Sequence, residues 1–341
     1  MKVPRSSTAH MINLVLYTCV VFANCVRPQV KQPNGQPLDD NYQVRSTPAL
    51  VERGRYLTQH VAACVDCHSQ RDWSRLAGPI IPGSWGGGGQ EYGKNYGLPG
   101  RVYGRNITPY ALKGWSDKEL LVAITAGVGK TGKPLFPLMP YANYHRIRQS
   151  DAEAIIVYLR TLPPVAQEVP PSRVPLPLRL GLRLLPHRAT LAPDSGATSG
   201  LAYGRYLTQL AGCADCHTNR TAGKLLKKAP FAGGMSISLA AMTKEGGTLR
   251  SANITPDSSA GLGSWSRQAF VARFKAYDSA VFVPPAAPEG FNTVMPWTLY
   301  AGMTESDLGA IYEYLRTVKP VKKPVVVYSP NRKNQPGKGA E

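Results

Sequence analysis

The feature that most constrains this chain is a cysteine motif that occurs twice in nearly the same surroundings. The sequence is GRYLTQHVAACVDCH over residues 54–68 and GRYLTQLAGCADCH over residues 204–217. Each copy ends in two cysteines three positions apart, with a histidine directly after the second. An NITP segment, a Trp-Ser pair, a Met-Pro pair and a YLRT segment then follow both copies in the same order. The chain is therefore an internal duplication, and any chemistry of the motif is present twice.

A chain of 341 residues is long enough for two domains that each bury a core. The duplication predicts a first repeat over 48–163 and a second repeat over 200–320, joined by a proline-rich linker over 164–199. Apolar residues recur at helical spacing, and the chain contains 33 glycines and 30 prolines. This combination favours a mostly α fold with long loops over extended sheets. The basic tail over 321–341 is predicted to be disordered.

Start and stop signals predict individual helices in the first repeat. Apolar spacing predicts a helix that ends just before the first cysteine motif. Ser116 is a predicted N-cap of a helix over 115–128, and Glu119 completes a capping box. A capped closing helix is predicted over 150–162, where two prolines end it. The second repeat shows the same order of signals.

The first 25 residues resemble an export leader. A basic start precedes an apolar run over 11–23 that is too short to span a bilayer as a helix. The run ends in FANC, and Cys25 resembles the lipidated cysteine of bacterial lipoproteins, although Asn24 stands where a smaller residue is usual. We therefore expect an exported protein on the periplasmic side, anchored to the membrane by its N-terminus. Simple cleavage and an uncleaved anchor are the alternatives to lipidation of Cys25.

The cysteine count leaves few uses for the two motifs. Cys19 and Cys25 belong to the leader, and all four other cysteines lie in the motifs. Disulfides would have to close within each CxxC, which would constrain so long a chain poorly. A zinc site would need both motifs to surround one metal ion. A thioredoxin-like pair would not need the histidine that follows.

Covalent haem binding uses every residue type in the motif. Two thiols three positions apart can add to the two vinyl groups at one edge of a porphyrin, and the adjacent imidazole can ligate the iron. We therefore predict two covalently bound haem c groups. The residues that bind them are predicted to be Cys64, Cys67 and His68 in the first repeat and Cys213, Cys216 and His217 in the second.

With these motifs the chain resembles bacterial dihaem cytochromes c, and in particular the cytochrome c subunits of membrane-bound dehydrogenases. The resemblance covers residues 50–322 and rests on the shared order of GRYL, CxxCH, NITP, Trp-Ser, MP and YLRT. It implies two tandem small all-α class I cytochrome c domains. In that family the opening and closing helices cross at a glycine and an aromatic residue. The matching pairs are Gly54 with Tyr158 and Gly204 with Tyr314.

The resemblance also implies a methionine ligand to each iron, on a loop before the closing helix. Met139 in LMPY and Met295 in VMPW occupy this place in their repeats. A histidine and methionine pair raises the reduction potential of haem. His60 and His145 compete with Met139, and we interpret both as surface or packing residues. The other methionines interpreted as packing residues are Met235, Met242 and Met303.

These residues predict a dihaem cytochrome c that transfers single electrons from a dehydrogenase or quinol donor to a terminal oxidase or soluble acceptor. Two six-coordinate irons leave no open position for a substrate, so we expect no catalysis. The alternative is a dihaem redox enzyme of the peroxidase or thiosulfate dehydrogenase type. Such an enzyme would treat its haems differently, whereas both repeats here carry the same MP pair. A third interpretation is a subunit of a larger complex, although relatives of that kind carry three CxxCH motifs.

The formal net charge of +19 favours redox partners with acidic docking surfaces, or anionic lipid head groups. A solvated basic surface without a single partner is the alternative. Nucleic acid is not expected, because no binding motif for it is present and the chain is expected to be exported. The segment LRLGLRLL over 178–185 is interpreted as part of the linker. An amphipathic patch that touches membrane or a partner is the alternative for this segment.

Overall fold

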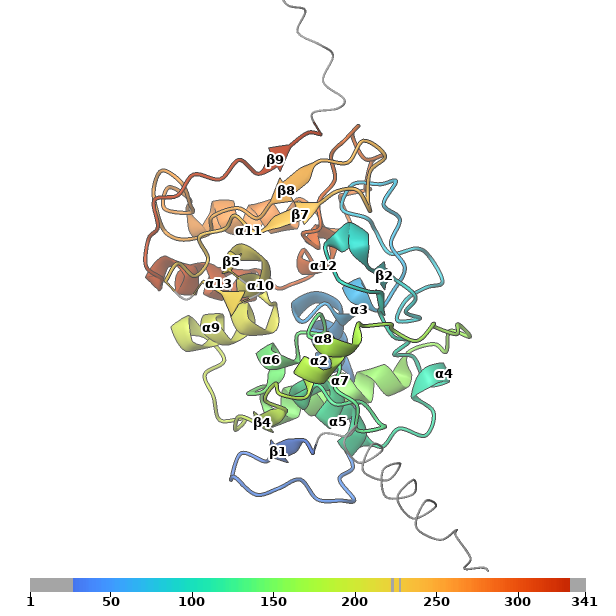
Figure 1. The fold of residues 1–341 in the computed structure, drawn as a ribbon. Helices are drawn as coiled ribbons and strands as arrows, with labels where there is room; N and C mark the ends of the chain where they lie inside the picture. Colours follow the sequence, from blue (N-terminus) through green and yellow to red (C-terminus); the bar gives the residue numbers. More distant parts are fainter. Residues whose placement is uncertain (1–26, 222–223, 227, 332–341) are drawn as a thin grey trace, which may run out of the picture. The chain divides into compact units, whose positions relative to one another are not determined.

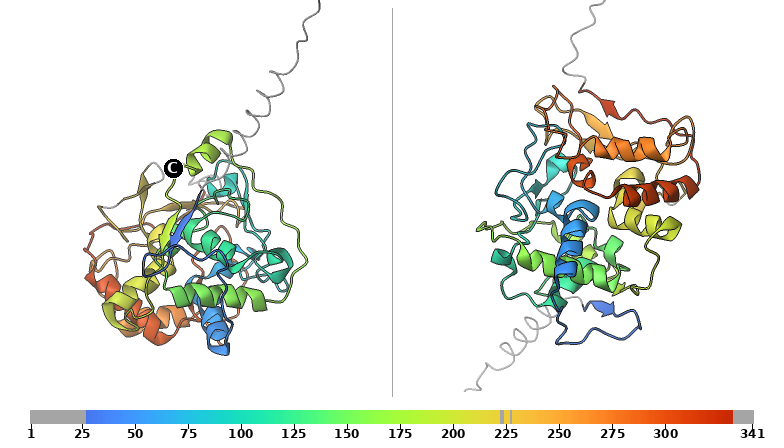
Figure 2. Two further views of the ribbon diagram at one scale, coloured as in Figure 1. Left: turned by 90° about the horizontal axis from the view of Figure 1, so that it is seen from below. Right: turned by 180° about the vertical axis from the view of Figure 1, so that it is seen from behind.

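A computed structural model defines the architecture of the chain (Figures 1 and 2). It describes residues 27–221, 224–226 and 228–331, so the predicted leader with Cys19 and Cys25 lies outside the described residues. The chain groups into two compact units. The smaller unit comprises residues 1–43, 115–147 and 176–192, and the larger unit comprises residues 44–114, 148–175 and 193–341.

The larger unit contains most of both repeats. Its helices are α2 (Pro48–Tyr56), the π-helix η1 (Leu57–Val61), α3 (Cys64–Cys67), the 3₁₀ helix η2 (Lys94–Tyr96), α4 (Pro109–Leu112), α7 (Gln149–Thr161), α9 (Gly200–Leu210), α10 (Cys213–His217), α11 (Arg267–Lys275), α12 (Trp297–Tyr300) and α13 (Glu305–Thr317). Its strands are β2 (Glu91–Tyr92), β3 (Val102–Tyr103), β5 (Arg220–Thr221), β6 (Lys224–Leu225), β7 (Ser236–Ser238), β8 (Thr248–Arg250) and β9 (Tyr328–Ser329). Antiparallel pairs join β2 to β3 and β5 to β6, and β8 lies between β7 and β9.

The smaller unit is built around one helix that carries the predicted capping box. Its elements are β1 (Gln29–Lys31), α5 (Asp117–Ala126), α6 (Tyr141–Tyr144), α8 (Leu176–Leu182) and β4 (Arg188–Thr190). Ser116 accepts a hydrogen bond from the backbone of Glu119, whose side chain accepts one from the Ser116 backbone, so the predicted capping box is confirmed. Strands β1 and β4 pair in parallel, and both contact α5.

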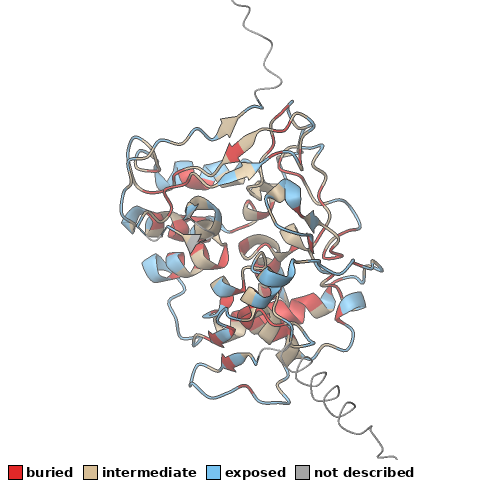
Figure 3. Cartoon of the chain, in the orientation of Figure 1, coloured by how far each residue is buried: buried red, intermediate tan, exposed pale blue. Residues whose placement is uncertain are grey.

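Helices make up 34% of the structure. Long loops connect them, and no strand in the described residues exceeds three residues. The predicted helices and loops are therefore present, whereas the two tandem all-α domains stay a prediction. The closing helices α7 and α13 contain many of the buried residues, whereas α2 contributes only Gly54 (Figure 3). In α7, for example, every residue from Ala154 to Leu159 is buried. Within the described ranges, none of the helices has both the length and the apolar character needed to cross a membrane.

Each opening helix crosses its closing helix at a glycine. Helix α2 packs against α7, and α9 packs against α13. A Cβ atom on Gly54 would lie 1.9 Å from the Ala154 carbonyl oxygen, and one on Gly204 would lie 1.9 Å from the Ala310 carbonyl oxygen. Only glycine permits this approach of the two backbones. The predicted pairs, Gly54 with Tyr158 and Gly204 with Tyr314, are confirmed by the tyrosine Cβ atoms beside each glycine.

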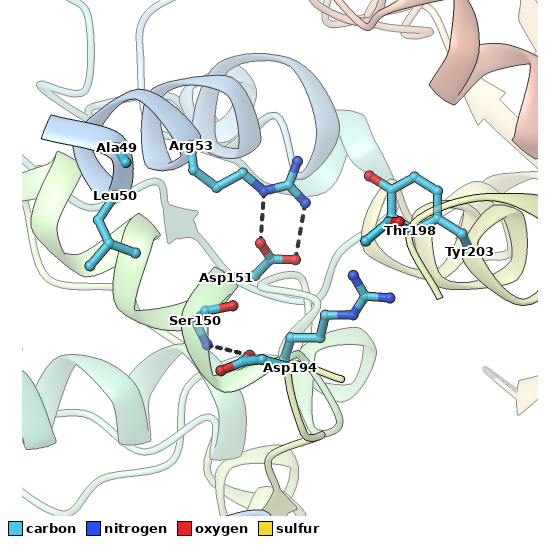
Figure 4. A pocket seen from close by; sticks show the side chains of 9 residues that line it. Ala49, Leu50, Arg53, Ser150, Asp151, Asp194, Thr198 and Tyr203 are labelled. Carbon is cyan, nitrogen blue, oxygen red and sulfur yellow. Dashed lines mark hydrogen bonds and ion pairs between the residues drawn. The ribbon is translucent and has the colours of Figure 1, made fainter. Parts of the chain in front are cut away.

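Two tyrosine-to-aspartate hydrogen bonds join the two repeats. Tyr56 in α2 donates to Asp307 Oδ2 in α13 at 2.7 Å, and Tyr206 in α9 donates to Asp151 Oδ2 in α7 at 2.6 Å. Both aspartates are buried. Arg53 pairs with Asp151 through two bonds of 2.8 and 3.1 Å (Figure 4). Because each repeat supplies the tyrosine for the other repeat's aspartate, the four helices form one packed group.

The start of α7 differs from the capped helix predicted over 150–162. The helix begins at Gln149, and its N-cap residue, Arg148, makes no capping hydrogen bond through its side chain. The carboxylate of Asp194 instead accepts a hydrogen bond from the Ser150 backbone N–H at 2.9 Å (Figure 4). A free backbone N–H at the start of α7 therefore receives its hydrogen-bond partner from the predicted linker, 44 residues further along the chain.

The predicted linker and the predicted tail both carry ordered structure. The linker contains α8 and β4. Residues 321–331 of the tail differ from the expected disorder, because β9 pairs with β8 and the Val321 backbone is hydrogen-bonded to Thr255 and Asn253. These long-range bonds satisfy the backbone of a basic, proline-containing segment that cannot form a helix of its own. Residues 332–341 lie outside the described residues.

Replacing Gly204 with alanine is expected to lower the free energy of unfolding by about 1–3 kcal/mol, because the added methyl group overlaps the Ala310 carbonyl. Gly181→Ala in α8 is the matched control, since a Cβ atom there meets nothing within 4 Å. Alanine is the better helix former, so the control should be as stable as the parent or up to about 1 kcal/mol more stable. Denaturant unfolding followed by circular dichroism measures both. Equal stability of Gly204→Ala and the parent would contradict the close crossing.

Candidate functional site

The two cysteine motifs adopt the same local conformation in the larger unit. The residue before the first cysteine is left-handed in both copies, with φ of 45° at Ala63 and 64° at Gly212. This residue ends the opening helix and starts a single helical turn, α3 or α10. Residues three positions apart lie on one face of a helical turn. Each turn thus presents its two thiols together, with the histidine at its end.

The first copy contains one residue more than the second, and the structure accommodates it as a π-turn. The Ala62 N–H donates to the Leu57 carbonyl, five residues earlier, at 2.8 Å. The equivalent bond in the second copy, from Ala211 to Leu207, spans four residues. His60 lies in this widened turn, and its side chain contacts the second repeat. Single-turn π-bulges inside α-helices occur frequently at functional sites.

His60 contacts the segment that follows Met295. Its Nδ1 lies 2.9 Å from the Leu299 carbonyl oxygen, and a Cβ atom on Gly302 would lie 2.1 Å from the ring. Burial lowers the pKa of His60, so the neutral ring donates its Nδ1 hydrogen to that carbonyl. This side chain is half-buried and packed. Its competitor His145 is exposed.

A backbone carbonyl orients each predicted haem-ligating histidine. His68 Nδ1 donates to the Arg105 carbonyl at 2.6 Å, and His217 Nδ1 donates to the Ala252 carbonyl at 2.8 Å. Burial lowers the pKa of both imidazoles. Each ring is therefore neutral with its hydrogen on Nδ1, which leaves the Nε2 lone pair available for iron. Histidine ligands of metals commonly have such a partner on the second ring nitrogen.

The two carbonyls come directly before the NITP segments, which a buried Asn and Thr hold in place. In the second repeat Asn253 donates to the carbonyls of Val321 and Lys323 at 2.7 and 3.3 Å, and its Oδ1 accepts from the Thr255 backbone and hydroxyl. The Thr255 hydroxyl also accepts from the Val321 N–H at 3.1 Å. The same bonds link Asn106 and Thr108 to residues 165–167. The loop that positions each histidine is thus fixed to the chain after each closing helix.

The four motif thiols are densely surrounded by protein atoms but remain partly accessible to solvent. Burial raises the pKa of Cys64 and Cys213 to about 12 and that of Cys216 to about 11, and it also raises the pKa of Cys67. Three of these side chains are half-buried, and Cys216 is exposed. All four thiols are therefore protonated at neutral pH and accessible from one side.

The first motif is surrounded by polar groups that would suit a bound anion. Trp73 Nε1 and the Tyr96 hydroxyl are buried without a hydrogen-bond partner, and the Arg71 guanidinium lies over the Trp73 ring at 4.9 Å. Arg71 is buried as well and pairs with Asp66, between the two cysteines. Buried donors beside a cation fit an oxygen-bearing anionic group. The donor set that haem c needs is present in each motif, as two protonated thiols and an imidazole whose Nε2 lone pair is free, so the residues fit the group that the sequence predicts.

Sequence reasoning missed the Asp–Arg pair, although its signal is repeated. An aspartate inside each CxxC is followed five positions later by an arginine, as Asp66 and Arg71 and as Asp215 and Arg220. The second pair is 3.7 Å apart and more exposed. Sequence reasoning also missed the carbonyl groups of Arg105 and Ala252, because a backbone group has no sequence signature of its own.

The two Met-Pro pairs form the same turn. A backbone bond of 2.8 Å joins the N–H two residues after each methionine to the methionine carbonyl. The proline between them has φ and ψ close to an inverse γ-turn in both loops, and a one-turn helix follows, α6 after Met139 and α12 after Met295. Both methionines are half-buried. By contrast Met242 and Met303 are buried in the core, and Met235 is half-buried outside such a turn.

The larger unit contains both cysteine motifs and Met295. Met139 lies in the smaller unit. Ala63 and Val65 of the first motif share one hydrophobic cluster with Leu299, four residues after Met295. In α12, the neighbouring Tyr300 hydroxyl donates to the Ala211 carbonyl before the second motif at 2.6 Å. The segment after Met295 is therefore held by both cysteine motifs. Within the described residues, no three His, Cys, Asp or Glu side chains converge as ligands of a free metal ion.

The sequence is similar to those of cytochrome c subunits of dehydrogenases. No family model matches the sequence. The chain is 31% identical over 287 residues to the gluconate 2-dehydrogenase cytochrome c subunit of Pantoea cypripedii, an alignment that covers 79% of this chain and 60% of the relative. It is 30% identical over 292 residues to the cytochrome c subunit of a quinone-dependent alcohol dehydrogenase of Gluconacetobacter polyoxogenes, covering 80% and 57%. It is 28% identical over 283 residues to the fructose dehydrogenase cytochrome subunit of Gluconobacter japonicus, covering 79% and 52%.

Thr255→Val is expected to lower the free energy of unfolding by about 1–3 kcal/mol, because the Val321 N–H and one lone pair of Asn253 Oδ1 lose their buried partner. Thr255→Ser keeps the hydroxyl and is the control, with the smaller loss. Urea unfolding of the purified protein measures the difference. Equal losses for the two variants would show that the hydroxyl network does not hold the loop.

Proposed function

The protein is a homologue of the cytochrome c subunits of gluconate, alcohol and fructose dehydrogenases, and from this premise we propose that it is a dihaem cytochrome c that transfers single electrons. Its homologues imply covalently bound haem c. The proposal assigns one haem to each repeat, with a cytochrome c domain over 48–163 and another over 200–320. The protein then acts as a carrier and not as a catalyst.

The repeated orientation of the histidine is the observation that supports this proposal most directly. Both imidazoles follow a CxxC turn, and both donate Nδ1–H to the carbonyl that precedes an NITP segment. A redox-active dithiol would not require the same imidazole orientation in both repeats, and in the described part of the chain no three His, Cys, Asp or Glu side chains gather as a zinc site would need. An iron ligand benefits from this orientation, because donation of Nδ1–H to a carbonyl leaves the Nε2 lone pair for the metal.

Each residue of the proposed sites has a stated task. When bound, haem c supplies an iron centre that accepts and releases one electron. Cys64 and Cys67 would hold the first haem and Cys213 and Cys216 the second, each through two thioether bonds. His68 and His217 would bind iron from one side, and Met139 and Met295 from the other. With both faces of each iron held by the protein, the sites have no position for a substrate.

The partners follow from the relatives and from the charge. The chain spans between 52% and 60% of the length of these three relatives, which are named as subunits of dehydrogenases. We propose that a dehydrogenase donates electrons to this protein and that an oxidase or soluble carrier accepts them. The net charge of +19 favours acidic docking surfaces on these partners. The site of action is the periplasmic side of the membrane.

A haem count tests this function. The purified protein should carry two covalent haems per chain, measured by whole-protein mass spectrometry and by absorbance of the haem. The double variants Cys64→Ser/Cys67→Ser and Cys213→Ser/Cys216→Ser should each lose one of them. The control Val281→Ser/Val283→Ser changes two residues that are 78% and 79% exposed outside the motifs and should retain both haems. A colourless product, or pigment that acid acetone extracts from the parent, would refute the proposal.

Met295→Ala should lower the reduction potential of the second haem and remove its share of the methionine-to-iron charge-transfer absorption, with the covalent attachment intact. The cause is loss of the soft sulfur ligand, which stabilises the ferrous state. Met235→Ala is the matched control, because Met235 is also half-buried but lies outside a Met-Pro turn. A redox titration followed optically measures both variants. An unchanged potential and absorption in Met295→Ala would exclude this ligand.

A further inference from the structure

Four leucines close together in the sequence are exposed on the smaller unit. Leu176, Leu180 and Leu184 are spaced four residues apart along α8 and the turn that continues it, and their exposed fractions are 55%, 46% and 87%. Leu185 is 37% exposed. An ordinary surface leucine stands alone. Here four lie within ten residues of chain, and α8 is mostly exposed in Figure 3.

The underside of this segment is fixed, so the leucines cannot turn inward. Leu182 is buried. The buried ring of His187 lies between two carbonyls, with Nδ1 2.9 Å from Ala126 O at the end of α5 and Nε2 3.0 Å from Leu182 O at the end of α8. Backbone bonds from Leu184 to Gly181 and from Leu185 to Leu182 extend the helix by a further turn. The outward orientation of the leucines is therefore part of the fold.

The charge around these leucines is positive. The smaller unit's segment over residues 176–192 contains Arg179, Arg183 and Arg188 and not a single Asp or Glu. Arg179 and Arg188 are exposed. Apolar side chains flanked by arginines fit the interface of a bilayer with anionic head groups, where leucine enters the acyl region and guanidinium binds phosphate.

The N-terminal end of the described chain lies beside the same segment. The Gln29 N–H donates to the His187 carbonyl at 2.9 Å, and β1 continues along β4. Cys25 precedes Gln29 by four residues, a reach of at most about 14 Å even when the chain is fully extended. The described chain thus begins beside the segment that carries the leucines. If Cys25 is lipidated, that anchor and the leucines would supply the two signals that stable membrane attachment generally requires.

We propose that residues 176–185 form a second membrane contact, which inserts its leucines into a bilayer that carries anionic phospholipid. The proposal rests on the periplasmic membrane location under the proposed function. It assigns a role to a segment between the two repeats that the haem chemistry does not use. The alternative partner of this segment is another protein subunit, and the test below distinguishes a bilayer from a protein partner.

The test uses the haem-loaded mature chain, exported behind a leader that is fully removed, so that no acyl chain is attached. Binding is measured by co-sedimentation with vesicles of phosphatidylglycerol and phosphatidylcholine, and with vesicles of phosphatidylcholine alone. Leu180→Gln/Leu184→Gln is compared with Val281→Gln/Val283→Gln, a control with two equally apolar side chains that are 78% and 79% exposed elsewhere. Arg179→Gln/Arg188→Gln tests the charge.

The parent should bind the anionic vesicles, and the leucine variant should bind about tenfold more weakly or less, because two leucines no longer leave water. The valine control should bind like the parent, and the arginine variant should lose affinity for anionic vesicles only. A leucine variant that binds like the parent would overturn the proposal, since general basic charge would then explain binding.

Absence of vesicle binding by the parent would also overturn the proposal. If a purified dehydrogenase subunit then bound the parent but not the leucine variant, the segment would be a protein docking site. The redox spectrum of the same samples separates this result from the proposed function. A protein with two normal haems that ignores vesicles would disprove the membrane contact and leave electron transfer intact.

Discussion

Two buried Asn–Thr pairs hold the elements of each proposed haem site in place. Each Asn joins the loop that precedes it to the chain that leaves the closing helix, and each Thr completes the same network. The carbonyl directly before the Asn then orients the histidine. One such bond contributes about 1 kcal/mol, but a buried group left without its partner costs more. The orientation of the histidine thus depends on bonds made far from it in sequence.

The two repeats are joined by contacts that each makes with the other. Tyr56 and Tyr206 occupy equivalent positions, and each donates to the aspartate in the first turn of the other repeat's closing helix. The π-turn adds a contact that is not symmetric, because the extra residue directs His60 against α12. An electron carrier benefits from such a rigid arrangement, since ligands that do not move need no rearrangement when the iron changes charge.

The surface of the smaller unit is organised differently from these sites. His187 joins the ends of α5 and α8 and leaves a row of leucines outward, while β1 brings the start of the described chain to the same place. The leucines and the arginines between them form an amphipathic surface. The proposed haem sites use residues of the larger unit and Met139 and none of these leucines.

The proposed chemistry comes from the sequence by itself, because covalent haem attachment needs two thiols and an imidazole in adjacent positions, and the repeat shows them twice. The sequence also predicted the capping box at Ser116, which depends only on neighbours along the chain. The glycine crossings came from the resemblance to cytochromes c, and the structure explains them by the missing Cβ atom. The tertiary structure alone decided that Asp194 satisfies the start of α7, that residues 321–331 are ordered, and that each tyrosine serves the other repeat. The reason is that a hydrogen bond between distant segments depends on where the folded backbone places them, and no local pattern records that distance.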